Sequence, residues 1–290
     1  EVYHLAFGSR WGKVCCGLSA LWMVMIMVVD LRFYAERYVS AVYPEAGKLA
    51  FYLAMAVLQL WIVRESLDCL LRTGKILFWV VILTLAAVLL LAVEKIQIYN
   101  LWPVTDTSWR EAGLGSLRLS TTLSMAVPAG FLLGTVEWKT RKNGAVWWVA
   151  ALTGAAMMIA VSVLGVFGPE LSQRLQVPFF TLAKEVSVTG AMERLESIIS
   201  AMWMMTDTAL MGVLAFSAEQ ALRQAAGAAK RPEWVRMSLI LLLVAVCCAL
   251  PKSTFDMDAG YQAIGMPINV LVGYFIPGTA LVVAKVRKRW

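Results

Sequence analysis

Long apolar runs, separated by short polar segments, follow one another along the whole chain. A membrane-spanning helix needs about 20 apolar residues, or about 17 where flanking Lys and Arg side chains reach the interface. The clearest run is Ile76–Val93, in which Thr84 is the sole polar side chain, whereas Val235–Leu250 is short and contains Arg236. The runs that meet this length are Val14–Leu31, Gly47–Val63, Ile76–Val93, Leu117–Val136, Gly144–Phe167, Leu195–Phe216, Val235–Leu250 and Ile264–Val283. The pattern predicts an all-α integral membrane protein with eight spans.

Composition agrees with this class and indicates an orientation. The 290 residues are 60% hydrophobic and 16% charged, with a mean hydropathy of +0.71. Soluble domains are about 25% charged, so we expect one polytopic membrane domain covering residues 1–290. The net charge of +7 lies at segment ends, as in Lys285–Arg289, which indicates topology and not nucleic-acid binding. Most of the 26 Lys and Arg residues fall on the side of the termini, which predicts cytoplasmic N- and C-termini.

The fourth run is uncharged from Leu119 to Val136 but rich in Ser, Thr, Gly and Pro. Pro128 removes a backbone donor and obstructs the carbonyl four residues earlier, near Ser124. Backbone groups freed inside a membrane are tolerated where protein or a wet cavity satisfies them. The run is therefore either a broken helix that lines a ligand site, or a Pro-kinked helix whose small residues pack on a neighbour. In the first case the ligand-binding candidates are Thr121, Thr122, Ser124, Pro128 and Gly130.

The connection from Val177 to Trp203 predicts a short amphipathic helix before the next span. This helix is opened by Pro178 and broken near Gly190, and a helix with one apolar face suits a membrane surface. Trp203 lies too deep in the following span to be a simple interfacial anchor, so we expect it to pack inside the bundle. The apolar face consists of Phe179, Leu182, Ala183 and Val186.

Asp207 is the one acid well inside an apolar run. Such a residue costs about 2.5–3.5 kcal/mol at the centre of a helix that inserts into the membrane. We expect it to face inward, toward the broken fourth run. There it is either a hydrogen-bonded structural residue or part of an ion or proton path that controls opening.

Other charged residues stand at the ends of runs. Glu193 and Arg194 precede the span that carries Asp207, where they either form a gate across the extracellular mouth or cap the helix. Asp30, Glu36 and Arg37 stand at the outer end of the first run and are interpreted as a solvated helix end.

No catalytic or metal-binding motif accompanies these features. The sequence has no GxSxG, HExxH or P-loop motif, and one histidine with five scattered cysteines gives no zinc or haem spacing. We therefore expect neither an enzyme nor a cofactor, and interpret the cysteines as small packing residues.

Three stretches in order resemble the spore germination permease family, the B subunits of germinant receptors. The loop Ile98–Trp109 is similar to an Asn-Leu-Leu-Pro-Val segment of that family, and Val166–Leu175 to a Phe-Gly-Pro-Glu turn. The connection after Pro178 is similar to a Pro-Thr-Leu-Glu helix followed by a Glu-Arg pair and a membrane Trp. The matched positions are Asn100, Leu101, Pro103, Val104, Phe167–Glu170, Glu193, Arg194 and Trp203.

The resemblance implies the fold of the amino acid/polyamine/organocation (APC) transporters, a LeuT-like bundle of two inverted repeats of five helices. Residues 117–283 then form the second repeat, which begins with the broken run. Residues 14–93 are the remainder of the first repeat, whose first two helices are missing. The chain begins at Glu1 and not at Met, which fits a truncated start.

The resemblance also implies a function: a membrane subunit of a spore germinant receptor that senses a small nutrient, such as an amino acid, and triggers germination. Its partners would be A-type and lipoprotein C-type receptor subunits, and its location the inner membrane of the spore. Two alternatives stay open. One is an amino acid secondary transporter driven by H⁺ or Na⁺, and the other is a scaffold that binds no ligand and holds partner subunits.

Overall fold

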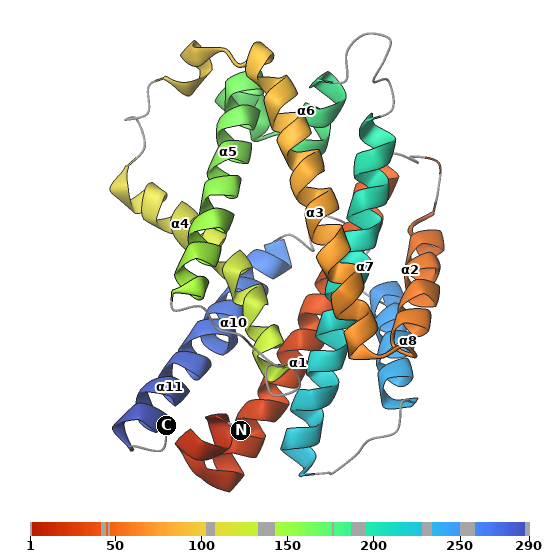
Figure 1. The fold of residues 1–290 in the computed structure, drawn as a ribbon, viewed down its shortest axis with the longest axis vertical. Helices are drawn as coiled ribbons and strands as arrows, with labels where there is room; N and C mark the ends of the chain where they lie inside the picture. The colour runs from red at the N-terminus through yellow and green to blue at the C-terminus, as the bar shows by residue number, and fades with distance from the viewer. Residues whose placement is uncertain are drawn as a thin grey trace.

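A computed structural model of the chain contains helices and no strands over the residues that it describes (Figure 1). These are residues 2–41, 45, 47–102, 108–132, 143–175, 177–186, 195–227, 234–249 and 259–287. The α-helices are α1 (Val2–Ala41), α2 (Lys48–Ile62), α3 (Leu67–Ala92), α4 (Trp109–Leu123), α5 (Gly144–Ser172), α6 (Pro178–Val186), α7 (Leu195–Ala226), α8 (Trp234–Ala249), α10 (Met266–Val270) and α11 (Ile276–Val286). The 3-10 helices are η1 (Val93–Lys95), η2 (Ile98–Leu101) and η3 (Ser124–Phe131), and the π-helices are η5 (Tyr261–Gly265) and η6 (Leu271–Phe275).

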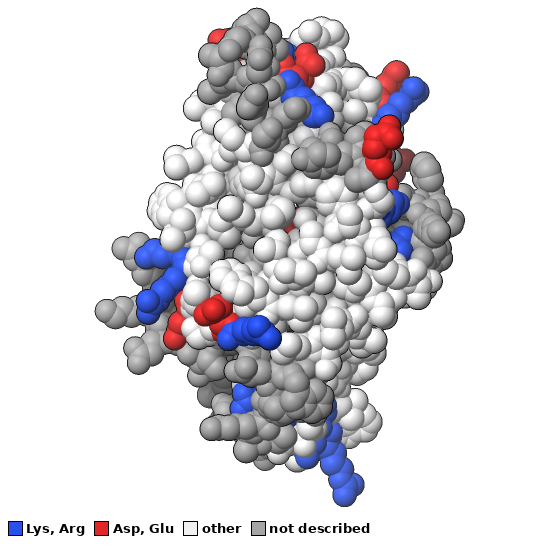
Figure 2. Space-filling view, turned by 90° about the vertical axis from the view of Figure 1, so that its right-hand side faces the viewer, with Lys and Arg blue, Asp and Glu red and all other residues white. Residues whose placement is uncertain are grey.

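Several of these helices are long and apolar enough to cross a membrane, so the chain is a multi-pass membrane protein. Figure 2 shows charged side chains above and below a broad region of uncharged residues on one face. Within the described residues, the five helices of this kind are Tyr3–Val39, Leu67–Lys95, Val146–Ser172, Ile198–Ala226 and Tyr261–Val286. Lys48–Ile62 and Met237–Ala249 are apolar but shorter. At about 1.5 Å per residue these two helices fall short of the hydrocarbon thickness, and the predicted run Leu117–Val136 lies partly outside the described residues, so eight spans are not confirmed.

The core forms where α1 and α7 pack along each other (Figure 1). α1 also packs against α2, α8 and α11, while α7 packs against α8, α2, α3 and η3. Ala35 on α1 and Ala215 and Ala218 on α7 are fully buried in this cluster, beside Trp22 and Met27. Small residues at a helix crossing let the backbones approach closely, so the α1–α7 seam is tight.

A second cluster covers the amphipathic helix that the sequence predicted. α6 begins at Pro178 and ends at Val186, and its apolar side packs against α3, α5 and α7. Its buried residues include Phe180 and Leu182, and they meet Val88 of α3 and Ile199 of α7. The helix is confirmed, but the interpretation that its apolar face lies on lipid is wrong, because protein covers that face.

The two loop motifs singled out in the sequence lie against each other. Asn100 of η2 donates from Nδ2 to the carbonyl oxygen of Gly165 in α5 at 2.9 Å, and the backbone N–H of Gln97 donates to the same oxygen at 2.9 Å. Three residues on, Gly168 has φ 72° and ψ 169° and bends α5, and a Cβ there would lie 3.4 Å from Asn100 Oδ1. Only glycine adopts this backbone readily, which explains the Gly-Pro turn at this point. The motifs thus join the end of α3 to the end of α5.

Candidate functional site

An ion pair joins the two central helices. Arg37 of α1 and Asp207 of α7 are 2.5 Å apart between Nη2 and Oδ2, and Asp207 is 8% exposed. The guanidinium of Arg37 also lies over the Trp203 ring, 5.5 Å from its centroid, and Trp203 stacks on Phe180. Asp207 therefore faces inward as expected, but its partner is on α1 and not in the fourth run. Trp203 packs inside the bundle, as predicted.

A second acid lies on the same side of α1. Asp30 is seven residues before Arg37, close to two helical turns, which places both on one face. Asp30 interacts electrostatically with both Asp207 and Arg37. Its Oδ2 atom is buried, and among the residues that the structure describes it has no hydrogen-bond partner.

The interpretation of Asp30, Glu36 and Arg37 as a solvated helix end is wrong. The helix does not stop at Leu31 but continues to Ala41, so this turn packs on the bundle. Arg37 turns to α7, whereas Glu36 pairs with Lys48 at the start of α2, with 2.5 Å between Oε2 and Nζ. The polar residues beyond the apolar run are held by partners from other helices, which apolar length alone does not reveal.

Neighbouring side chains hold the ion pair in place. Tyr38 of α1 donates its hydroxyl hydrogen to the carbonyl oxygen of Ser200 in α7. Gln59 of α2 donates from Nε2 to the carbonyl oxygen of Thr208, the residue after Asp207, at 2.7 Å. Two helices, α1 and α2, therefore bond to α7 within two turns of Asp207.

The fourth run is interrupted where the sequence predicted. The α-helical turns of α4 end at Leu123, and a 3-10 helix begins at Ser124, four residues before Pro128. Thr121, Ser124 and Pro128 are buried, and the Ser124 hydroxyl donates to the carbonyl oxygen of Thr121 at 2.5 Å. Gly130 is exposed, with open space around the position of a Cβ. The Thr122 side chain, Glu193 and Arg194 lie outside the described residues.

The last helix packs its own irregular turns against this segment. Asn269 lies between the π-helical turns η5 and η6, where it is fully buried. Its Oδ1 accepts from Trp22 Nε1 of α1 at 2.7 Å, and its Nδ2 donates to the Tyr261 hydroxyl at 3.0 Å. A Cβ on Gly273 would lie 2.5 Å from the Cβ of Ser124. The broken segment and the last helix thus meet at backbone contact distance beside a buried polar network.

Sequence reasoning missed this network, although signals were present. Asn269 is the one amide side chain of the apolar run Ile264–Val283, with Pro267 and Gly273 nearby, and π-turns are frequent at functional sites. The network also reaches the charged residues, since the Tyr261 ring stands edge-on to Phe33 of α1, 6.3 Å between centroids. Phe33 lies between Asp30 and Arg37 on that helix.

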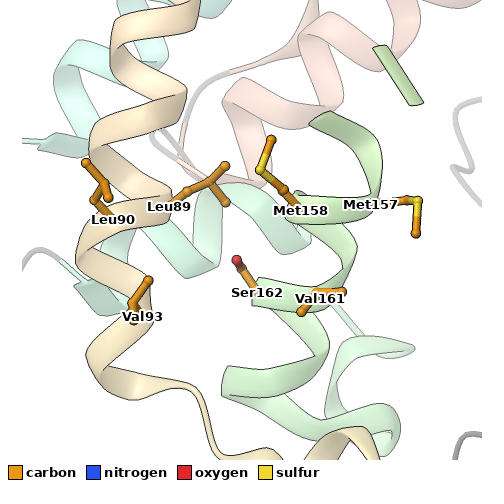
Figure 3. A pocket seen from close by; sticks show the side chains of 7 residues that line it. All are labelled: Leu89, Leu90, Val93, Met157, Met158, Val161 and Ser162. Carbon is orange, nitrogen blue, oxygen red and sulfur yellow. The ribbon is translucent and has the colours of Figure 1, made fainter. Parts of the chain in front are cut away.

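A separate apolar pocket of about 360 Å³ opens between α3 and α5 (Figure 3). It is lined by Leu89, Leu90, Val93, Met157, Met158, Val161 and Ser162. In Figure 3 the Ser162 hydroxyl is the polar group among these side chains. None of the ligand-binding candidates of the fourth run lines it. Among the described residues, no group of three or more His, Cys, Asp or Glu side chains is placed to hold a metal ion.

Comparison with known proteins identifies the family of the chain. A family model described as "Spore germination protein" matches residues 1–256. The chain belongs to this family. It is 24% identical over 196 residues to "Putative spore germination protein YfkT" of Bacillus subtilis (strain 168), which covers 66% of this chain and 53% of that protein. The chain thus spans about half the length of this curated relative, and no solved structure matches it significantly.

Proposed function

We propose that the chain is the membrane subunit of a spore germinant receptor that senses a small nutrient, an amino acid by preference, and triggers germination. It acts by binding and not by catalysis, in the inner membrane of the spore, together with A-type and lipoprotein C-type subunits. Membership of the spore germination protein family supports the process, and the multi-pass fold supports the location in a membrane.

The observation that carries the proposal is the contact between the broken fourth run and the last helix. Both segments leave regular α-helical geometry within the bundle, and their backbone hydrogen bonds follow 3-10 or π spacing. Irregular backbone at membrane depth is tolerated where it is buried in protein or lines a cavity. Thr121, Ser124, Tyr261 and Asn269 add hydroxyl and amide groups at this seam. Such groups suit the carboxylate and ammonium of an amino acid, and interrupted helices provide substrate sites in transporters.

The helix contacts support a LeuT-like inverted repeat. α1 touches α2, α8 and the last helix, and α7 touches α8, α2 and α3. Exchanging α1 with α7, α2 with α8, and α3 with the last helix leaves this set of contacts unchanged. The pattern is expected if residues 14–93 and 117–283 derive from two repeats inside one membrane domain.

The test uses two glycines of the last helix in the full-length protein of the spore former that carries it. Gly273→Ala forces the helix away from Ser124, whereas Gly278→Ala meets nothing within 4 Å. We expect Gly273→Ala to shift or abolish the germination response to amino acids at normal protein level, with Gly278→Ala close to the parent. A parental dose–response curve for Gly273→Ala would contradict the proposed site.

The buried charges of α1 and α7 keep a secondary transporter driven by H⁺ or Na⁺ as a second candidate. Uptake of labelled amino acids by proteoliposomes that contain the full-length protein would favour transport. A germination defect in a deletion strain without an uptake defect would favour the sensor. Parental germination when Ser124 and Gly273 are both enlarged would favour the scaffold that binds no ligand.

A further inference from the structure

At the α1–α7 seam, the acidic side chains outnumber the basic ones. Asp30 and Asp207 supply two carboxylates and Arg37 supplies one cation, and the electrostatic interactions of Asp30 are with these two residues. Arg37 is bound to Asp207, which leaves the buried Oδ2 of Asp30 without a hydrogen-bond partner among the described residues. Asp30 as a residue is half-buried, but a carboxylate oxygen buried without a partner is unfavourable, whereas a neutral carboxylic acid is tolerated.

In the part of the chain that the structure describes, the other helices around Asp30 supply no second cation at this point. On the side of α8, Arg32 donates from Nη1 to the carbonyl oxygen of Cys247 at 3.1 Å. On the side of the last helix, the titratable Tyr261 stands edge-on to Phe33 and bonds to Asn269. On the side of α2, Lys48 is paired with Glu36. The charge that acts on Asp30 thus comes from Arg37 and Asp207.

A proton neutralises Asp30 more readily than a metal ion would. Hard metal cations take several oxygen ligands, for example 6–8 for Ca²⁺, and the described residues offer no cluster of three ligating acids, Cys or His. The guanidinium of Arg37 would also repel a metal cation, whereas one proton on one oxygen is enough to neutralise Asp30.

We propose that Asp30 and Asp207 share one proton and one arginine, with the proton on Asp30 while Arg37 is bound to Asp207. The alternative state has the proton on Asp207 and Arg37 on Asp30. The exchange moves one proton between two carboxylates and changes the hydrogen-bond partner of a guanidinium that stays protonated, so the net charge is constant. The arginine side chain leans back toward the N-terminus of α1, the direction of Asp30.

The exchange couples a proton to the α1–α7 seam. In the first state Arg37 ties α1 to α7, and in the second it bonds within α1 and releases that tie. Proton transfer between the two acids therefore changes the strength of the contact on which the fold is centred. This inference stands on the charged residues alone and does not depend on the germinant site.

The test is infrared difference spectroscopy of the purified full-length protein in lipid nanodiscs, following the C=O stretch of a buried, protonated carboxylic acid during a pH titration. The parent should show one such band at neutral pH. Asp30→Asn should lose it, because the acid that carries the proton is gone. Asp207→Asn should lose it too, because Arg37 then turns to Asp30 and holds it as a carboxylate.

Arg37→Gln should give about twice the band intensity of the parent, since neither acid then has a cation and both are protonated. Asp68→Asn, at an exposed acid in the first turn of α3, should leave the band unchanged. Absence of the band in the parent, or its persistence in Asp30→Asn, overturns the proposal. A band unaffected by Asp207→Asn shows that Asp30 is protonated for structural reasons alone and also overturns it. If Arg37→Gln fails to fold, the bands of Asp30→Asn and Asp207→Asn still decide whether the two acids share one proton.

Discussion

The Trp22 indole donates a 2.7 Å hydrogen bond to the Asn269 side chain, although 247 residues separate the two along the chain. The bond joins the central helix α1 to the irregular last helix at the level of the broken fourth run. Because Asn269 also donates to Tyr261, one amide side chain holds the position of groups from two helices.

Replacing Asn269 by Leu should lower stability by about 1–3 kcal/mol, because the buried Trp22 N–H then lacks its acceptor. Thermal unfolding in nanodiscs measures the loss. Trp22→Phe removes the same donor and keeps most of the packing. Combined with Asn269→Leu, it should cost much less than it does alone, since the bond is already broken. Additive losses would show that the hydrogen bond contributes little.

Helix α5 contains two glycines that can be compared, Gly168 at the bend that contacts Asn100 and Gly154 in the regular part of the helix. Gly168→Ala places a Cβ at φ 72°, where strain of about 1–3 kcal/mol is expected. Gly154→Ala, with nothing within 4 Å, should be neutral or slightly stabilising because alanine favours helix. Melting temperature and protein level measure both. Equal behaviour of the two variants would contradict the strained turn.

Topology can be read from single cysteines placed at the two ends of the molecule. A Cβ at Gly227, where α7 ends, would lie 3.3 Å from the Nζ of Lys13, near the start of α1, and Figure 1 places both termini at one end. With cytoplasmic termini, an impermeant thiol reagent added outside should label Thr107→Cys but not Gly227→Cys, in a background without the native cysteines. The reverse labelling would overturn this orientation. Thr107 lies outside the described residues, and its side follows from the predicted topology.

Two substitutions of Asp207 distinguish the contribution of its charge from that of its packing. Asp207→Asn keeps the shape of the side chain, and Arg37 can turn to Asp30, so protein level should stay near the parent while the germination rate changes its dependence on pH. Asp207→Leu breaks the buried ion pair and leaves an apolar side chain at this point of the α1–α7 seam, at a cost of about 3–5 kcal/mol, and should accumulate poorly. If Asp207→Asn follows the parent at every pH while Asp207→Leu fails to accumulate, the residue has a structural role alone.

The sequence predicted what depends on local pattern. The helical class, the start of α6 at Pro178 and the interruption at Ser124 all follow from apolar length, spacing and the chemistry of proline. The exposed side of α5 is likewise apolar, as a lipid-facing helix requires.

The pairings between distant segments could not be predicted in the same way. Asp207 was expected to meet hydroxyl groups of the fourth run, but its partner Arg37 is 170 residues away, beyond the end of the first apolar run. Asn269 was missed, and Asp30 was wrongly interpreted as part of a solvated helix end, because a polar residue in an apolar run carries no sign of what faces it. Such partners follow from the packing of whole helices.

The close contact of Ser124 with Gly273 has a consequence for how anything binds there. Gly273 has no side chain, and the Cβ and Oγ of Ser124 fill the space beside its backbone, so a molecule that enters this seam has to part the helices first. The apparent affinity then equals the intrinsic affinity reduced by the small fraction of molecules in which the seam is already open. The concentration at which a response begins is therefore set by how firmly these two residues pack, as well as by the groups that contact the bound molecule.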